Sequence, residues 1–273
     1  MEFDNPGNNA TTVSINRRQW LKTTAAVTAG SFLYPTRAKA WAWPHGQGKS
    51  SAIETGTIQY PSGDAKLNAF VAKPTSGGTH ASLLLIHDDT GLNDHAMQVV
   101  RNFADSGFYA FAPDLLSHSG GIAQFKNADQ VTEALNRLSP DQTAEDLRAG
   151  YSYLRSTLNP DASAYAVGLG WGGWRTFLLA EKVSGLARAV VYSGSAPSAG
   201  LSEIETKFLA HYGQYDFRLA GNALWVEQEL GKRFTYFIYP SVDHGFYDDS
   251  SPQFNAEAAK LAWSRTLEFL RAA

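Results

Sequence analysis

The sequence predicts a single α/β domain with a mostly parallel central sheet and helices on both faces of that sheet. Three observations support this fold class. Strand-like apolar runs alternate with helical periodicity, one of these runs is continuously apolar, and a chain of 273 residues with 44% hydrophobic residues can bury one sizeable core. Such alternation indicates parallel strands, and ligands then bind at the carboxyl ends of those strands.

The first elements are expected to form a hairpin and two strands around a helix. GTIQYP and LNAFVAKP are separated by the turn residues Ser62-Gly63-Asp64, which predicts an antiparallel pair. SLLLIH at 82–87 is apolar throughout, as is typical of a strand buried on both faces of a parallel sheet. A helix at about 94–106 and the strand FYAFAP are expected to follow.

The remaining elements continue the alternation. A helical region is expected over about 127–158, interrupted at Ser139-Pro140 because proline ends or starts a helix. The strand SAYAVG and a helix beginning at Trp171 come next. The last expected elements are the strands LARAVVYS and KFLAHYG, a helix around 218–230, the strand RFTYFIYP and a helix at about 255–271.

The first 40 residues resemble an export signal. Asn16-Arg17-Arg18-Gln19-Trp20-Leu21-Lys22 is a twin-arginine pattern, and the apolar run TTAAVTAGSFLY and Ala38-Lys39-Ala40, an A-x-A cleavage signature, follow it. The run is about a dozen residues, shorter than the ~20 that cross a bilayer. We therefore expect a twin-arginine signal peptide at 1–40, a linker at 41–54, the folded domain at 55–273, and a periplasmic or secreted location.

Charge and cysteine content exclude several kinds of partner. Without the first 40 residues, the chain holds 18 basic and 24 acidic residues, a net charge of −6. A mildly acidic body without basic runs argues against nucleic acid or an anionic membrane as partner. The chain has no cysteine, so disulfides and thiolate metal sites are excluded. We expect no cofactor and no metal site.

Three loops at strand ends carry the candidate catalytic residues. Gly168-Leu-Gly170-Trp-Gly172 follows a strand and begins a helix, which is the context of a hydrolase nucleophile turn. Asp216 follows KFLAHYG, and His244 follows RFTYFIYP. The order nucleophile, acid, histidine is that of α/β-hydrolases, in which the acid orients the histidine and the histidine takes a proton. Asp216 and His244 are the predicted acid and base.

The segment from about Thr55 to Ala273 resembles the dienelactone hydrolase (carboxymethylenebutenolidase-like) family. The resemblance rests on LLLIHDDTGLNDH, FYAFAPDLLSHSGG, VGLGWGGW and HYGQYDF, and above all on the long stretch YPSVDHGFYDDSSPQFNAEAAKLAWSRTLEFL. It implies an α/β-hydrolase fold and a hydrolase of small esters or lactones with a Cys, Asp and His triad. Asp216 and His244 match the acid and the base, whereas Gly170 stands where the Cys belongs.

The resemblance also assigns the surroundings of the site. Asp88 matches a Glu beside the nucleophile but is one methylene shorter, and His118 is nearest to an arginine that helps to hold a substrate carboxylate. The implied oxyanion hole consists of the backbone N–H groups of Trp171 and Asp89. Both Asp88 and His118 are therefore expected to contact substrate.

Glycine at position 170 leaves two functional classes open. In the first, His244 and Asp216 activate a water in the space left by Gly170, and covalent activity is weak or absent. In the second, the cleft is a non-catalytic binding site for a small ester, lactone or carboxylate. Neither Ser193 nor Ser195 has flanking glycines at both −2 and +2, so their loop is interpreted as an ordinary turn. A nucleotide site at the glycines is disfavoured because the turn is not the first strand–helix unit.

Overall fold

The computed structural model describes residues 52–75, 80–160 and 162–272. The predicted signal peptide and nearly all of the predicted linker lie outside these residues. Strand β1 (Ile53–Ser62) begins two residues inside the predicted linker, because its pairing with β2 (Ala65–Pro74) continues until Ile53 lies opposite Pro74. The predicted hairpin is present, with a turn at Gly63-Asp64.

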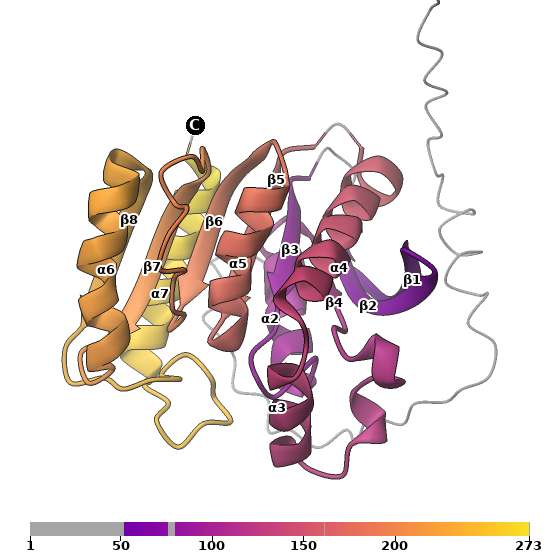
Figure 1. Ribbon diagram of the computed structural model, residues 1–273, viewed down its shortest axis with the longest axis horizontal. Helices are drawn as coiled ribbons and strands as arrows, with labels where there is room; N and C mark the ends of the chain where they lie inside the picture. Colours follow the sequence, from indigo (N-terminus) through magenta and orange to yellow (C-terminus); the bar gives the residue numbers. More distant parts are fainter. Residues whose placement is uncertain (1–51, 76–79, 161, 273) are drawn as a thin grey trace, which may run out of the picture.

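The described residues form an eight-stranded sheet with the order β1-β2-β4-β3-β5-β6-β7-β8 (Figure 1). β2 runs antiparallel to β1 and to β4, and the strands from β4 to β8 are parallel neighbours. The remaining strands are β3 (Ser82–Ile86), β4 (Tyr109–Pro113), β5 (Ala164–Leu169), β6 (Leu186–Tyr192), β7 (Lys207–Gly213) and β8 (Phe234–Tyr239). The mostly parallel sheet predicted from the sequence is confirmed.

Helices cover both faces of the sheet. α2 (Asp94–Asp105) and α7 (Ala256–Arg271) share one buried apolar cluster, whereas α3, α4, α5 and α6 share the cluster on the other face. In Figure 1 α4, α5 and α6 lie on the near side of the sheet. Their bounds are Ala128–Asn136 for α3, Pro140–Tyr153 for α4, Trp171–Lys182 for α5 and Phe217–Leu230 for α6.

Local sequence signals fix where several of these helices begin. The side chains of Asn93, Asn127, Ser139 and Asn255 each accept a hydrogen bond from a backbone N–H in the first turn of the helix that follows. Pro140 occupies the first position of α4, where a missing N–H costs nothing, so the predicted break at Ser139-Pro140 separates α3 from α4. α4 ends in a single π-helical turn over Leu154–Leu158.

The centre of the sheet is buried. Every residue of β3, β4 and β5 is buried, as the continuous apolar run at 82–87 predicts. The loops that leave the carboxyl ends of β3, β5, β6, β7 and β8 therefore start from fixed positions, and the candidate site lies among them. No helix within the described ranges is long and apolar enough to cross a membrane.

Candidate active site

The turn between β5 and α5, the elbow, has a glycine, Gly170, at its centre. Gly170 has φ +44° and ψ −107°, a conformation that side chains rarely adopt and glycine adopts readily. A Cβ on Gly172 would lie 2.4 Å from the Ile86 carbonyl oxygen, so glycine is also needed there for the helix to approach β3. The elbow is thus held by backbone packing and does not depend on a side chain at position 170.

Asp216 and His244 form the predicted dyad. His244 Nδ1 lies 2.7 Å from Asp216 Oδ2, within hydrogen-bond reach. The two loops are tied together by backbone bonds from Gln214 N to the Tyr239 oxygen and from Tyr215 N to the Val242 oxygen, both 2.9 Å. The Asp216 side chain is 13% exposed, whereas that of His244 is 51% exposed, so the imidazole is open to a ligand.

The hydrogen bond to Asp216 raises the pKa of His244 above its ordinary value, and the nearby charges of Asp216, Asp88 and Asp89 add to this effect against the opposing effect of burial. A raised pKa makes the imidazole a stronger base. It also identifies Asp88 and Asp89 as charges close enough to act on His244. The dyad therefore has the orientation and the electrostatics of a general base.

The Asp88 carboxylate occupies the position beside the elbow where a nucleophile side chain would begin. Its Oδ1 accepts hydrogen bonds from Trp171 N at 2.8 Å and from Asp89 N at 2.7 Å, and its Oδ2 accepts one from the Tyr247 hydroxyl at 2.7 Å. A Cβ built on Gly170 would lie 2.2 Å from Oδ1 and 2.3 Å from Oδ2. The space left by the missing side chain is therefore filled.

This arrangement corrects one expectation from the sequence. A water in the space left by Gly170 is excluded there, because the Asp88 carboxylate lies in it. The predicted oxyanion-hole donors, the N–H groups of Trp171 and Asp89, do converge on one point, but the atom at that point is Asp88 Oδ1. Two peptide N–H groups and a phenol offer a carboxylate the charge-assisted hydrogen bonds that it prefers.

The dyad, the elbow and Asp88 face one open cleft of about 830 Å³. Three acidic residues, Asp88, Asp89 and Asp216, line this cleft against one arginine, Arg175. Burial, followed by the charge of Asp88, raises the pKa of Asp89. Burial lowers the pKa of Arg175 to about 10, which leaves it cationic at neutral pH. The excess of carboxylates favours neutral ligands over anionic ones.

Sequence reasoning named only the backbone N–H of Trp171, set Ser193 aside as a turn residue, and missed Arg175. Trp171, Arg175 and Ser193 line the cleft, and each has a buried polar atom without a hydrogen-bond partner in the described part of the chain: Nε1, Nε and Oγ. The Arg175 guanidinium lies 3.3 Å from the centre of a Trp171 ring, a cation–π contact. Arg175 lies one helical turn beyond Trp171, a spacing visible in the sequence.

Ser193 lies in the loop for which the sequence predicts an ordinary turn. It directly follows β6, whose Tyr192 pairs with Leu169, the residue before Gly170. Its φ of +47° is unusual for a residue other than glycine. Tyr247, whose hydroxyl is bonded to Asp88, was also not predicted; it lies three residues after His244 in a stretch that the resemblance covers.

His118 is not brought to the cleft. Its Nε2 lies 2.9 Å from Oδ2 of the buried Asp146, and it is not among the residues that line the cleft. Asp146 also accepts hydrogen bonds from Ser62 and Gln142. His118 therefore belongs to a polar cluster that links the short turn after β4 to α4. This cluster lies away from the dyad.

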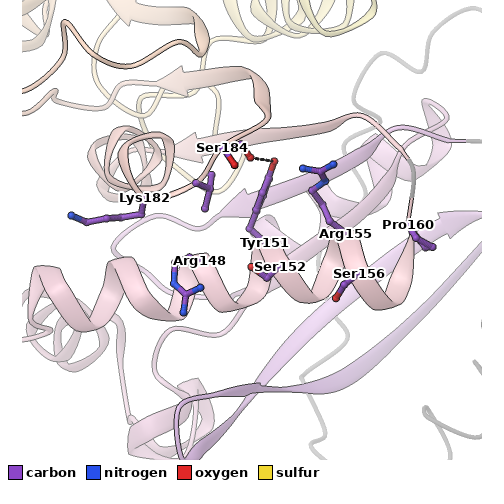
Figure 2. A pocket seen from close by; sticks show the side chains of 9 residues that line it. Arg148, Tyr151, Ser152, Arg155, Ser156, Pro160, Lys182 and Ser184 are labelled. Carbon is purple, nitrogen blue, oxygen red and sulfur yellow. Dashed lines mark hydrogen bonds between the residues drawn. The ribbon is translucent and has the colours of Figure 1, made fainter. Parts of the chain in front are cut away.

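A smaller pocket of about 430 Å³ lies between the end of α4 and the end of α5 (Figure 2). It is lined by the cations Arg148, Arg155 and Lys182. Arg148 is paired with Glu145, and Lys182 with Glu181 at 2.9 Å. Tyr151 donates a hydrogen bond to the Ser184 carbonyl oxygen across it. No member of the dyad or the elbow reaches this pocket.

One group of described side chains could bind a metal ion. The ligand atoms of His95, Asp248 and Asp249 lie within 4.8 Å of one another. His95 Nδ1 is 3.2 Å from Asp248 and 3.1 Å from Asp249, so these residues already hold one another. These contacts attach the loop after His244 to α2, so the three residues have a structural role without a metal ion.

Comparison with known proteins gives a family for this site. The model of the dienelactone hydrolase family matches residues 67–273. The chain is 25% identical over 239 residues to "Putative carboxymethylenebutenolidase" of Methylorubrum extorquens, covering 81% of this chain and 82% of that protein. It is 26% identical to the protein of the same name in Synechocystis, covering 80% and 97%.

A solved structure supports the fold independently. "Putative Dienelactone Hydrolase from Klebsiella pneumoniae" superposes with a TM-score of 0.73 at 22% identity, covering 81% of this chain and all of that one. The family match includes the elbow, Asp216 and His244. The chain belongs to the dienelactone hydrolase family, within the α/β-hydrolase superfamily, and carries a glycine at the centre of the elbow.

Proposed function

We propose that this protein hydrolyses small, neutral esters or lactones with a water molecule that His244 and Asp216 activate. The observation that carries the proposal is the 2.7 Å contact between His244 Nδ1 and Asp216 Oδ2 at the wall of an open cleft. In this arrangement Asp216 fixes the tautomer of the imidazole, and Nε2 is free to accept a proton from water. The attack then occurs without a covalent enzyme intermediate.

The position of Asp88 supports slow turnover. A tetrahedral intermediate places its oxyanion on the N–H groups of Trp171 and Asp89, but both donate to Asp88 Oδ1. A substrate carbonyl must displace the carboxylate or react without these donors. Loss of one oxyanion-hole donor lowers kcat by about 10² to 10³ in a serine hydrolase, so ester hydrolysis here is expected to be weak.

The position of Asp88 on these N–H groups also favours the second candidate, a binding protein with no turnover. A carboxylate held by three hydrogen bonds is a stable ground state, and the rest of the cleft still offers an aromatic and polar wall. The excess of acidic groups supports a neutral ester or lactone over a free carboxylate in either case. His118, the counterpart of the family's arginine, lies elsewhere, which agrees with a substrate that lacks a carboxylate.

Ester hydrolysis in the presence and absence of the base separates the two candidates. Wild type, His244→Ala and the exposed-surface variant Asp64→Asn are compared on a panel of activated small esters and lactones. If the protein is an enzyme, we expect saturable turnover that His244→Ala reduces by at least about tenfold, which corresponds to about 1.4 kcal/mol in the activation free energy. Saturable binding of a panel member with equal background hydrolysis in all three proteins supports the binding protein instead.

We also propose that the protein is exported through the twin-arginine pathway to the periplasm. The proposal rests on Arg17-Arg18 and Ala38-Lys39-Ala40, which lie outside the described residues. In a bacterium with a working pathway, the periplasmic form should begin at or near Trp41. Replacement of both arginines by lysine should leave the precursor in the cytosol; equal export of that variant would contradict the proposal.

A further inference from the structure

We propose that the Asp88 carboxylate is itself a nucleophile, and that it displaces a halide from a saturated carbon of a small neutral alkyl halide. This activity goes beyond the ester hydrolysis proposed above. Its second step rests on the same His244–Asp216 dyad, whereas its first step does not involve the dyad. The inference starts from the position of the carboxylate and from what the surrounding groups can do without moving.

Asp88 stands in for the missing elbow side chain. The ideal Cβ position of residue 170 lies 2.2–2.3 Å from both carboxylate oxygens, so the carboxylate lies where an elbow nucleophile would start. The carboxylate lines the same cleft as His244. Asp88 belongs to the loop that follows the buried strand β3, and three hydrogen bonds fix its orientation. A fixed nucleophile facing a cleft is the requirement for an oriented attack.

The first step forms one carbon–oxygen bond and breaks one carbon–halogen bond. Asp88 Oδ2 attacks the carbon from the side opposite the halogen, which leaves with the bonding electron pair as halide. The product is an alkyl ester on Asp88, and no proton is transferred. The attack needs no oxyanion hole, because the carboxylate loses its negative charge and no oxyanion forms.

One cation on the cleft wall suits the departing anion. Arg175 lines the cleft, and burial lowers its pKa only to about 10, so its guanidinium stays cationic at neutral pH. Its positive charge favours the halide as the carbon–halogen bond breaks. Trp171 Nε1 and Arg175 Nε belong to residues that line the cleft, but both atoms are themselves buried.

The second step explains why Asp88 Oδ1 lies in the oxyanion hole. His244 takes a proton from water, and the water oxygen attacks the carboxyl carbon of the Asp88 ester. The oxygen that becomes negative is Oδ1, which Trp171 N and Asp89 N already bind. Collapse breaks the ester's carbonyl–oxygen bond, and the proton from His244 completes the alcohol. The Asp88 carboxylate is regenerated when the second proton of the attacking water goes to solvent.

Halide displacement starts from the observed position of the Asp88 carboxylate. Ester hydrolysis that uses the N–H groups of Trp171 and Asp89 must first displace this carboxylate from them. The cleft's three carboxylates also suit a neutral alkyl halide and disfavour an anionic one. The absence of cysteine removes the most reactive competing nucleophile, so alkylation can be assigned cleanly.

The experiment uses full-length protein with phenacyl bromide, a small neutral alkyl halide, in water enriched in ¹⁸O. Hydrolysis of the ester inserts one oxygen of water into the carboxylate in each turnover. Wild type should release bromide at least about tenfold faster than Asp88→Asn. Peptide mass spectrometry should find ¹⁸O in Asp88. Asp64→Asn, at an exposed turn, is the matched control and should behave as wild type.

His244→Gln isolates the first step, because the ester then forms and is not hydrolysed. We expect one phenacyl group on Asp88 in this variant and none at that position in wild type after excess reagent is removed. Unlabelled Asp88 in wild type, or alkylation confined to other residues, would overturn the proposal, even if Asp88→Asn failed to fold. A phenacyl ester equally persistent in wild type and His244→Gln would overturn the second step and with it the turnover.

The result of the alkyl halide experiment can be distinguished from the result of the ester and lactone assays. Ester turnover lost in His244→Ala together with an unlabelled Asp88 leaves the water-based hydrolase standing and removes the nucleophile. Labelled Asp88 without ester turnover does the reverse.

Discussion

Restoring a thiol to the elbow should be destabilising unless Asp88 is removed first. In Gly170→Cys the new Cβ would lie 2.2 Å from the Asp88 carboxylate, which must leave its site. The displaced group loses hydrogen bonds from Trp171 N, Asp89 N and the Tyr247 hydroxyl, and each bond to a charged group contributes about 1.5–3 kcal/mol. Water restores part of this loss once the carboxylate is outside.

Backbone strain adds to the effect. A side chain at φ +44° costs about 1 kcal/mol or more. Gly170→Cys should therefore lower the free energy of unfolding by roughly 3–5 kcal/mol, since the strain adds to the lost hydrogen bonds. In an Asp88→Ala background those bonds are already absent, and the same substitution should cost only the strain, about 1 kcal/mol. The two substitutions should thus be coupled by about 2–4 kcal/mol.

Urea unfolding of the wild type, the two single variants and the double variant measures this coupling. The same four proteins are assayed on an activated small ester. Only the double variant has a thiol beside His244 and free N–H donors on Trp171 and Asp89, so it alone should gain at least about tenfold in hydrolysis. Additive unfolding free energies, or an equal gain in the single Gly170→Cys variant, would refute the conclusion that Asp88 blocks the elbow.

Three further predictions concern the dyad, the support of Asp88 and a helix terminus. The hydrogen bond to Asp216 raises the pKa of His244, so ester hydrolysis should be lost as pH falls through a value above 6.5. In Asp216→Asn this loss of activity at acid pH should shift to lower pH, and kcat should fall by about 10² or more. Profiles of rate against pH for both proteins measure the two effects. An unchanged pH dependence would remove Asp216 from the dyad. Tyr247→Phe removes the donor to Asp88 Oδ2 and should lower the free energy of unfolding by about 1.5–3 kcal/mol in urea titrations, whereas an unchanged midpoint would show that this bond contributes nothing. Asn255→Ala removes the cap that accepts from Ala258 N and should cost about 1 kcal/mol by the same measurement, with ester hydrolysis unchanged; altered hydrolysis would mean that α7 influences the cleft.

Much of the fold could be predicted from the sequence because its signals are local. The apolar run at 82–87, the break at Ser139-Pro140 and the Ser62-Gly63-Asp64 turn each act over a few residues, and each produced the expected element. The order of strand ends likewise placed Asp216 and His244 at one edge of a parallel sheet, and their 2.7 Å contact followed. The start of β1 at Ile53 was missed because it depends on the length of its partner strand.

The side chains that decide the chemistry were beyond local reasoning. Asp88 was expected beside the nucleophile, but its shorter side chain turns into the hole made by Trp171 N and Asp89 N, a choice that depends on atoms 83 residues away. The unpaired Trp171 Nε1 and Arg175 Nε, and the left-handed Ser193, depend likewise on how β3, β5 and β6 lie side by side. His118 was expected near substrate because the resemblance places it closest to the family's arginine, whereas the buried Asp146 binds it elsewhere.

The sequence by itself therefore determined the layers of the fold, the placement of Asp216 and His244 after two strands, and the glycine at position 170. It could do so because hydrophobic periodicity, turn residues and residue identity are properties of the chain itself. Only the tertiary structure decided what fills the vacant position. That outcome depends on whether two peptide N–H groups and one phenol, brought together from three separate segments, converge on the same carboxylate, and on a backbone at φ +44° that leaves room for it. Such convergence is a property of packing in three dimensions, and no local pattern encodes it.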